Sequence, residues 1–117
     1  NARLKPYVEG VQLATGQLKE ATMWLMQNGM SNFDNAGAAS HDYLHLFGIT
    51  ALAYMWALMA KASLEAKANG GAADPYYDGK LATGRYFVER VAPDSAAHLA
   101  KVKAGSASMM ALAADAF

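Results

Sequence analysis

Two histidines four residues apart are the residues whose spacing could do chemistry. His41 and His45, in the segment H-D-Y-L-H, would share one helix face, and two imidazoles so placed can bind one zinc ion. In the related metalloprotease motif H-E-x-x-H the glutamate is the general base, whereas Asp42 stands there in this chain. His98 is the only other histidine, so no third ligand is evident. The pattern favours histidines on a helix surface or interface over a metal site.

Other catalytic patterns are incomplete. A di-iron bundle needs two Glu-x-x-His motifs, and the chain offers only Asp42-x-x-His45. No G-x-S-x-G elbow surrounds Ser106 or Ser108, and a serine nucleophile needs a base and an oxyanion hole. Four glutamates fall where the helical pattern points to solvent: Glu9, Glu20, Glu65 and Glu89. We therefore predict no catalytic, cofactor-binding or metal-binding residue in this chain.

Composition narrows the class of protein. The chain has 117 residues, which suits one domain, and 54% of them are hydrophobic, an excess that suggests an apolar face for a partner. Equal numbers of acidic and basic residues, 10 each, disfavour nucleic acid as a partner. The absence of cysteine fits a reducing compartment, and we expect a cytoplasmic protein. Residues 46–60 are uncharged but shorter than a membrane span of about 18–20 residues, so we expect a buried helix.

Three long helices must position these residues. The first is predicted over residues 6–28, with Pro6 in its first turn and Gly29 as a left-handed cap. Residues 30–37 are predicted to form a loop. The expected seam of this helix follows spacings of three and four: Val8, Val11, Thr15, Leu18, Thr22 and Leu25.

The second helix is predicted over residues 40–68, with Ser40 as its N-cap and Asn69-Gly70-Gly71 ending it. It is apolar on several faces, which is typical of a helix buried on more than one side. Its expected main seam again alternates three and four: Leu44, Gly48, Ala51, Met55, Leu58 and Ala62.

The third helix has the clearest start, because Asp74 is an N-cap residue and Pro75 suits the first helical position. Pro93 removes a hydrogen bond inside the pattern, and we predict a kinked helix that ends near Ala104. Gly105 is then its cap, and Ser106 caps a short final turn. The expected seam is Leu81, Gly84, Val88, Val91, Ser95, Leu99 and Val102.

These elements predict an all-α fold, an antiparallel up-down bundle of three long helices plus a short C-terminal turn. Asn1-Ala2 looks like a cloning scar, so we expect residues 3–117 to form a single helical-bundle domain of a longer natural protein.

Four segments, in order along the chain, resemble motifs of one enzyme family. Residues 43–48 are similar to Y-L-x-L-F-G, and residues 80–89 to K-L-x-T-A-R-F-Y/F-x-E, with Gly84 in place of alanine. Residues 21–26 resemble A-T-x-W-L, and residues 104–112 resemble A-G-A-D-S-L-M-A-L. Pro93 and Phe117 also match. Together they resemble the C-terminal domain of acyl-CoA dehydrogenases of the 3-methylmercaptopropionyl-CoA dehydrogenase type.

The resemblance implies a flavoenzyme parent that oxidises an acyl-CoA to an enoyl-CoA. Its FAD site and catalytic glutamate belong to upstream domains, and nothing in this chain matches them. The implied role is therefore an accessory domain, not catalytic alone, that packs on the upstream dehydrogenase domains or supports a homo-oligomer. The alternative is a freestanding helical protein-interaction module.

Overall fold

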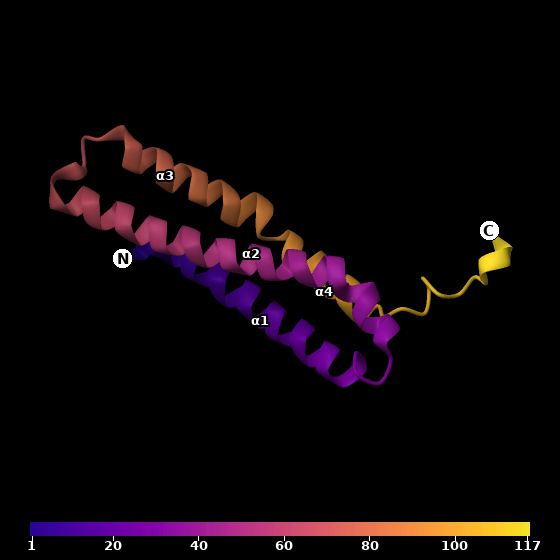
Figure 1. The fold of residues 1–117 in the computed structure, drawn as a ribbon. Helices are drawn as coiled ribbons and strands as arrows, with labels where there is room; N and C mark the ends of the chain where they lie inside the picture. The colour runs from indigo at the N-terminus through magenta and orange to yellow at the C-terminus, as the bar shows by residue number, and fades with distance from the viewer.

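The computed structural model describes residues 1–117 and consists of helices joined by short turns (Figure 1). The four α-helices are α1 (Lys5–Asn28), α2 (Phe33–Ala66), α3 (Pro75–Tyr86) and α4 (Asp94–Lys103). Short 3-10 turns stand near the two ends, at Ala2–Leu4 and Ala114–Ala116. Because α3 and α4 together form one arm, the predicted all-α bundle of three long helices is confirmed.

Gly29 follows α1, but not as the predicted left-handed cap. Its φ and ψ are −78° and −33°, which is right-handed helical. Its amide donates to the carbonyl oxygen of Leu25 at 2.7 Å. A Cβ at position 29 would lie 2.7 Å from that same oxygen, so glycine is required here by close approach rather than by a positive φ.

The second helix begins seven residues before the predicted start. Asn32 has extended backbone angles, and its side-chain oxygen accepts a hydrogen bond from the amide of Asp34 at 3.0 Å. Ser40 instead lies inside α2, where its hydroxyl donates to the carbonyl oxygen of Gly37 at 2.8 Å. The predicted N-cap at Ser40 and loop over 30–37 are therefore wrong. Asn32 followed by an acidic first turn is itself a strong start signal.

The turn after α2 matches the sequence. A wide turn over Lys67–Gly71 ends with Asn69 at φ −104° and Gly70 at φ +99°, a conformation that favours glycine. The Asp74 carboxylate then accepts from the amide of Tyr76 at 2.9 Å, and Pro75 is the first residue of α3.

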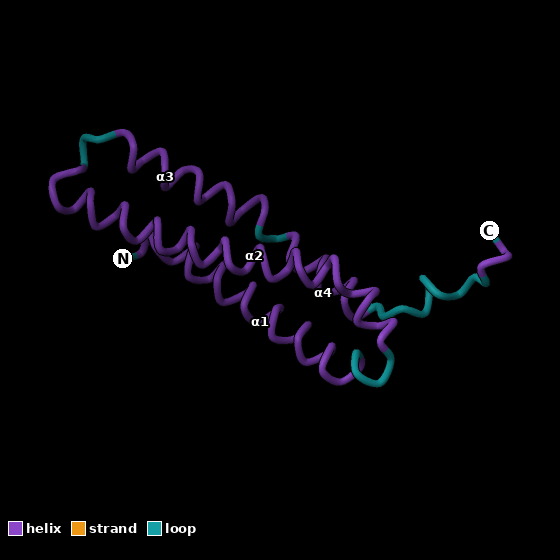
Figure 2. The backbone as a smooth tube through the Cα atoms, viewed as in Figure 1, coloured by secondary structure: helices purple, strands orange, loops and turns teal.

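The third arm bends between α3 and α4, where Figure 2 shows a short loop segment. Pro93 stands directly before α4, so the predicted kink is confirmed. Ahead of the proline, Phe87–Val91 widens into a π turn, and the amide of Ala92 donates to the carbonyl oxygen of Phe87 at 2.8 Å. Ala92 and Pro93 keep right-handed helical angles, so the arm is redirected rather than ended. Gly105, at φ +74°, follows α4 as the predicted cap.

The core is thin. Only 19 of the 117 residues are buried. Twelve of them form three hydrophobic clusters of four along α2, which contacts α1, α3 and α4. The molecule is long and slender, measuring 66 × 28 × 15 Å, and α1, α2 and α4 all contact one another. Because α2 packs only against α1 and the arm of α3 and α4, its remaining face is uncovered.

Candidate interaction surface

The three histidines lie near one another between α2 and α4. The ring centroids of His41 and His45 are 4.1 Å apart, and those of His45 and His98 are 5.4 Å apart. The Nδ1 of His45 hydrogen-bonds the carbonyl oxygen of His41 at 2.8 Å. The Nδ1 of His98 lies 2.9 Å from Oδ1 of the buried Asp42. The sequence did not reveal this long-range pair, because its partners are far apart in the chain.

This cluster joins α2 to α4. No group of three or more His, Asp or Glu side chains is arranged to hold a metal ion. A buried carboxylate is costly unless it has a partner, and the contact between Asp42 and His98 supplies one across the α2–α4 interface.

The other candidate residues serve the bundle or face solvent. The four glutamates weighed as acid-base groups are all exposed. Glu20 pairs with Lys103 at 2.8 Å, and Glu89 with Arg85 at 2.5 Å. Ser106 was predicted to cap a short final turn, and this prediction is wrong. Its hydroxyl donates instead to Oδ1 of Asn35 in α2 at 2.9 Å.

The predicted seam of α2 is on the wrong side of the helix. Leu44, Met55 and Leu58 have exposed fractions of 69, 48 and 42%. Gly48 is partly exposed, and Ala51 and Ala62 are exposed. We call these six residues the outer face of α2. The predicted seams of the other two arms lie on the correct side. The seam of α3 and α4 is buried or half-buried throughout, and in the seam of α1 only Val8 is exposed.

The buried face of α2 lies opposite the outer face and has the same three-and-four spacing. Its fully buried members include three alanines, which let the neighbouring helices approach closely. The face carries Ala39, Asp42, Leu46, Ile49, Ala53, Ala60, Ser63 and Leu64. Periodicity alone could not choose between the two stripes. The alanines at positions 39, 53 and 60, which are 14 and 7 residues apart and so share one helix face, were the available signal.

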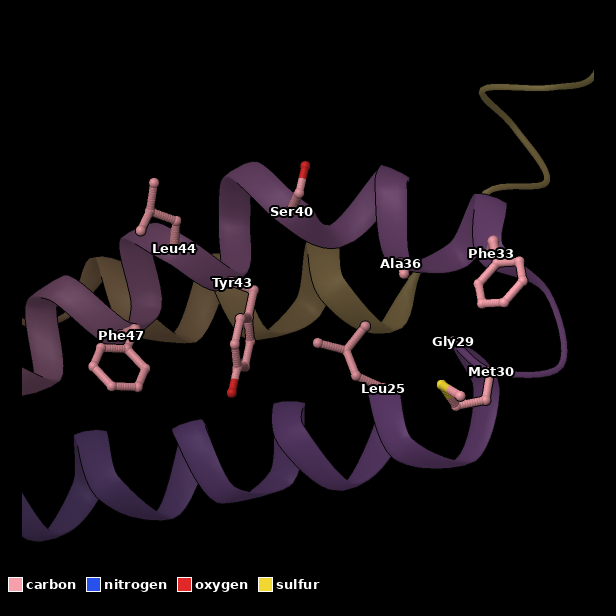
Figure 3. A pocket seen from close by; sticks show the side chains of 9 residues that line it. All are labelled: Leu25, Gly29, Met30, Phe33, Ala36, Ser40, Tyr43, Leu44 and Phe47. Atoms are coloured by element: carbon pink, nitrogen blue, oxygen red, sulfur yellow. The ribbon is translucent and has the colours of Figure 1, made fainter.

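An apolar groove lies where α1 turns into α2 (Figure 3). It has a volume of about 450 Å³. Leu25 projects from α1 and Tyr43 from α2 into the space between the helices, and the Tyr43 hydroxyl is 2.7 Å from that of Thr22. Met30 and Phe33, at its end, are 76 and 74% exposed. We call this the junction groove, and its full lining is Leu25, Gly29, Met30, Phe33, Ala36, Ser40, Tyr43, Leu44 and Phe47.

The segment Phe33–Gly71 is also long and apolar enough, by length and composition alone, to cross a membrane. Core helices pass the same test. Only 17% of its most apolar window is buried within the molecule, so the expectation of a buried helix holds for one side of α2 and fails for the other.

One family of known proteins matches this sequence. No curated protein matches the chain. A family model described as acetyl-CoA dehydrogenase C-terminal like matches residues 1–113, which is nearly the whole chain and includes all four of its α-helices. The chain therefore belongs to the acetyl-CoA dehydrogenase C-terminal-like family.

Proposed function

We propose that this chain is the accessory C-terminal domain of a flavin-dependent acyl-CoA dehydrogenase, an enzyme that converts an acyl-CoA to an enoyl-CoA. The domain contributes packing and assembly, and the chemistry belongs to other domains of the parent. The observation that carries the proposal is the uncovered apolar surface formed by the outer face of α2 and the junction groove.

The amount of exposed surface supports this role. The chain has an accessible surface of 7486 Å², whereas a compact monomer of 12.4 kDa exposes about 6,100 Å². Part of the excess lies on the extended C-terminal tail. The whole difference, tail included, is larger than the roughly 800 Å² per partner of a standard interface.

The cofactor that the family implies for the parent, FAD, does not suit the junction groove. The junction groove is lined mostly by apolar side chains and by no Lys or Arg, so nothing there neutralises a pyrophosphate. Incubation of the chain with FAD followed by desalting should therefore leave a colourless protein. A retained flavin absorption band would contradict this assignment.

We further propose that the junction groove receives the dehydrogenase domains of the same chain. Replacing Phe33 by Glu tests this, because the side chain is 74% exposed here and an acidic first turn favours a helix. We expect the isolated domain to melt as before, while the full-length enzyme melts lower, by roughly 2–4 °C for each kcal/mol of docking energy lost.

The matched control is Tyr86→Glu, which replaces another exposed aromatic residue, on α3 and outside the groove. It should leave the melting temperature of the full-length enzyme unchanged. A full-length Phe33→Glu enzyme that melts like the wild type and resists proteolysis equally well would refute groove docking.

A further inference from the structure

The outer face of α2 alternates large and small side chains in a particular order. Leu44 is followed by the small Gly48 and Ala51, then by two large residues, and the stripe ends at the small Ala62. When the stripe is laid against a reversed copy of itself, every large residue faces a small one. The stripe is therefore complementary to itself in reverse.

Gly48 is not required by the fold of the single chain. Its φ is not positive, and a Cβ there would meet nothing within 4 Å. Glycine inside a helix is destabilising relative to alanine. By contrast, a Cβ on Gly84 would lie 2.9 Å from the Tyr7 ring. Gly48 therefore leaves room on the outer face for a large side chain from another molecule.

An antiparallel partner places such side chains correctly. In antiparallel helix pairs with this spacing, the knobs of one helix fill the holes of the other. A two-fold axis level with Ala53 sets Leu44 against Ala62 of the second copy, Gly48 against its Leu58, and Ala51 against its Met55. A parallel pair would instead set Leu44 against Leu44 and leave Gly48 opposite Gly48.

We propose that the outer faces of two copies of this chain pack as an antiparallel pair and form a two-fold symmetric dimer. The inference rests on the proposed role of the outer face as an interface, and it names the occupant as a second copy. A two-fold contact of this kind closes on itself, so association stops at the dimer.

The absence of charge along the outer face and the length of the contact are consistent with a second copy as the partner. Residues 46–60 carry no charge, so pairing two copies buries no unmatched ion along that stretch. The contact from Leu44 to Ala62 is about 27 Å long at 1.5 Å per residue. Leu52 and Tyr54, each more than half exposed, widen it on both flanks. One helix pair of this length predicts a concentration-dependent dimer rather than an obligate one.

Disulfide trapping tests the orientation, because the chain has no cysteine. We would mix a Leu44→Cys chain with an Ala62→Cys chain under mild oxidation. The antiparallel pair brings these positions together, and we expect a cross-linked heterodimer in the mixture. Neither variant should cross-link to itself, because like positions lie about 27 Å apart in the pair. Leu44→Cys mixed with Thr83→Cys, an exposed position on α3, is the negative control.

A size exchange tests the packing. Ala51→Leu puts a large residue against Met55 of the second copy at both symmetric contacts and should weaken dimerisation about tenfold or more, because the added bulk overpacks the interface. Adding Met55→Ala to the same chain restores one large and one small residue at each layer and should restore the dimer. Both positions are exposed in the single chain, so unchanged helicity by circular dichroism confirms that the variants fold.

A chain that stays monomeric at every concentration in light scattering would overturn the dimer. So would self-cross-linking of Leu44→Cys alone, or binding to phosphatidylcholine vesicles in place of dimerisation. These results leave the accessory-domain proposal standing, because that proposal is decided by Phe33→Glu in the full-length enzyme.

Discussion

Gly84 lies where three helices converge. A Cβ there would come within 2.9 Å of the Tyr7 ring and 3.0 Å of the Trp56 ring. The resembling family motif has alanine at this position, and the substitution to glycine in this chain is explained by the two aromatic rings. Sequence comparison could note the difference, but only the packing of α1 and α2 against α3 gives its cause.

Gly84→Ala should lower the free energy of unfolding by about 1–3 kcal/mol, because the added methyl group overpacks a filled site. Gly79→Ala, one turn earlier in the same helix, meets nothing within 4 Å and should raise it by up to about 1 kcal/mol. Urea denaturation of both variants measures the difference. Equal effects at the two positions would contradict the packing described for Gly84.

Tyr7 makes the stability of the bundle sensitive to alkaline pH. Burial raises the pKa of its phenol, and the nearby Arg85 and Arg3 oppose that rise. The folded state therefore favours the neutral phenol. Its contribution is complete below the unfolded pKa of about 10 and is lost as pH rises through the higher folded value.

Tyr7→Phe should flatten this alkaline decline. The variant also loses the hydrogen bond from the Tyr7 hydroxyl to the carbonyl oxygen of Leu81, which is 2.7 Å long, at a cost of about 0.5–1.5 kcal/mol. Melting temperatures of both proteins, followed from neutral pH to above about pH 10, provide the test. Parallel curves would show that another group controls the alkaline transition.

At the scale of the helices, the start of α2 can be tested directly. Asn32→Ala removes the side-chain cap and should cost about 0.5–2 kcal/mol. Ser40→Ala, at the position first expected to be the cap, should be nearly neutral because Ser40 lies inside the helix and alanine is the better helix former. Chemical denaturation measures the loss of stability in both variants. A larger loss for Ser40→Ala than for Asn32→Ala would support the shorter helix that begins at Ser40.

The helices show which features a sequence can specify. Asp74 with Pro75, and Gly70 and Gly105, mark boundaries through local backbone chemistry, so the sequence predicts them. The choice of buried face in α2 depends on neighbours. Both of its stripes are apolar at the same spacing, and the stripe with Ala39, Ala53 and Ala60 is buried because small residues let α1 and α4 come close.

The candidate interaction surface can be predicted from the sequence less completely than the helices. The sequence indicated surplus apolar residues, but the junction groove is made by two helices and the turn between them. The outer face was visible as a stripe and was assigned to the core. Only the observed packing shows that it is free.

At the scale of the whole molecule, the radius of gyration is 18.8 Å, against about 13 Å for a compact domain of this length. The long helical layer and the tail beyond Ser106, which extends away from the bundle (Figure 1), both contribute. Nothing after Ser106 is buried. The tail is held at its base by Asn35, which accepts hydrogen bonds from both the amide and the hydroxyl of Ser106.

Removing residues 107–117 should therefore leave the melting temperature of the isolated domain unchanged within error. Asn35→Ala should lower it, because the buried hydroxyl of Ser106 loses its partner at a cost of about 1–3 kcal/mol. Differential scanning calorimetry compares the two. A truncated chain that melts well below the full one would show that the tail packs on the bundle.

The flat shape of the domain also determines how it tumbles. A body 66 Å long and 15 Å thick rotates faster about its long axis than end over end. The helices run roughly along that axis (Figure 1), so most amide N–H bonds point along it and sample mainly the slow end-over-end rotation. In ¹⁵N relaxation measurements the helical amides should therefore behave as those of a larger protein, and stacking a second layer on the outer face would reduce this anisotropy even as the mass doubles.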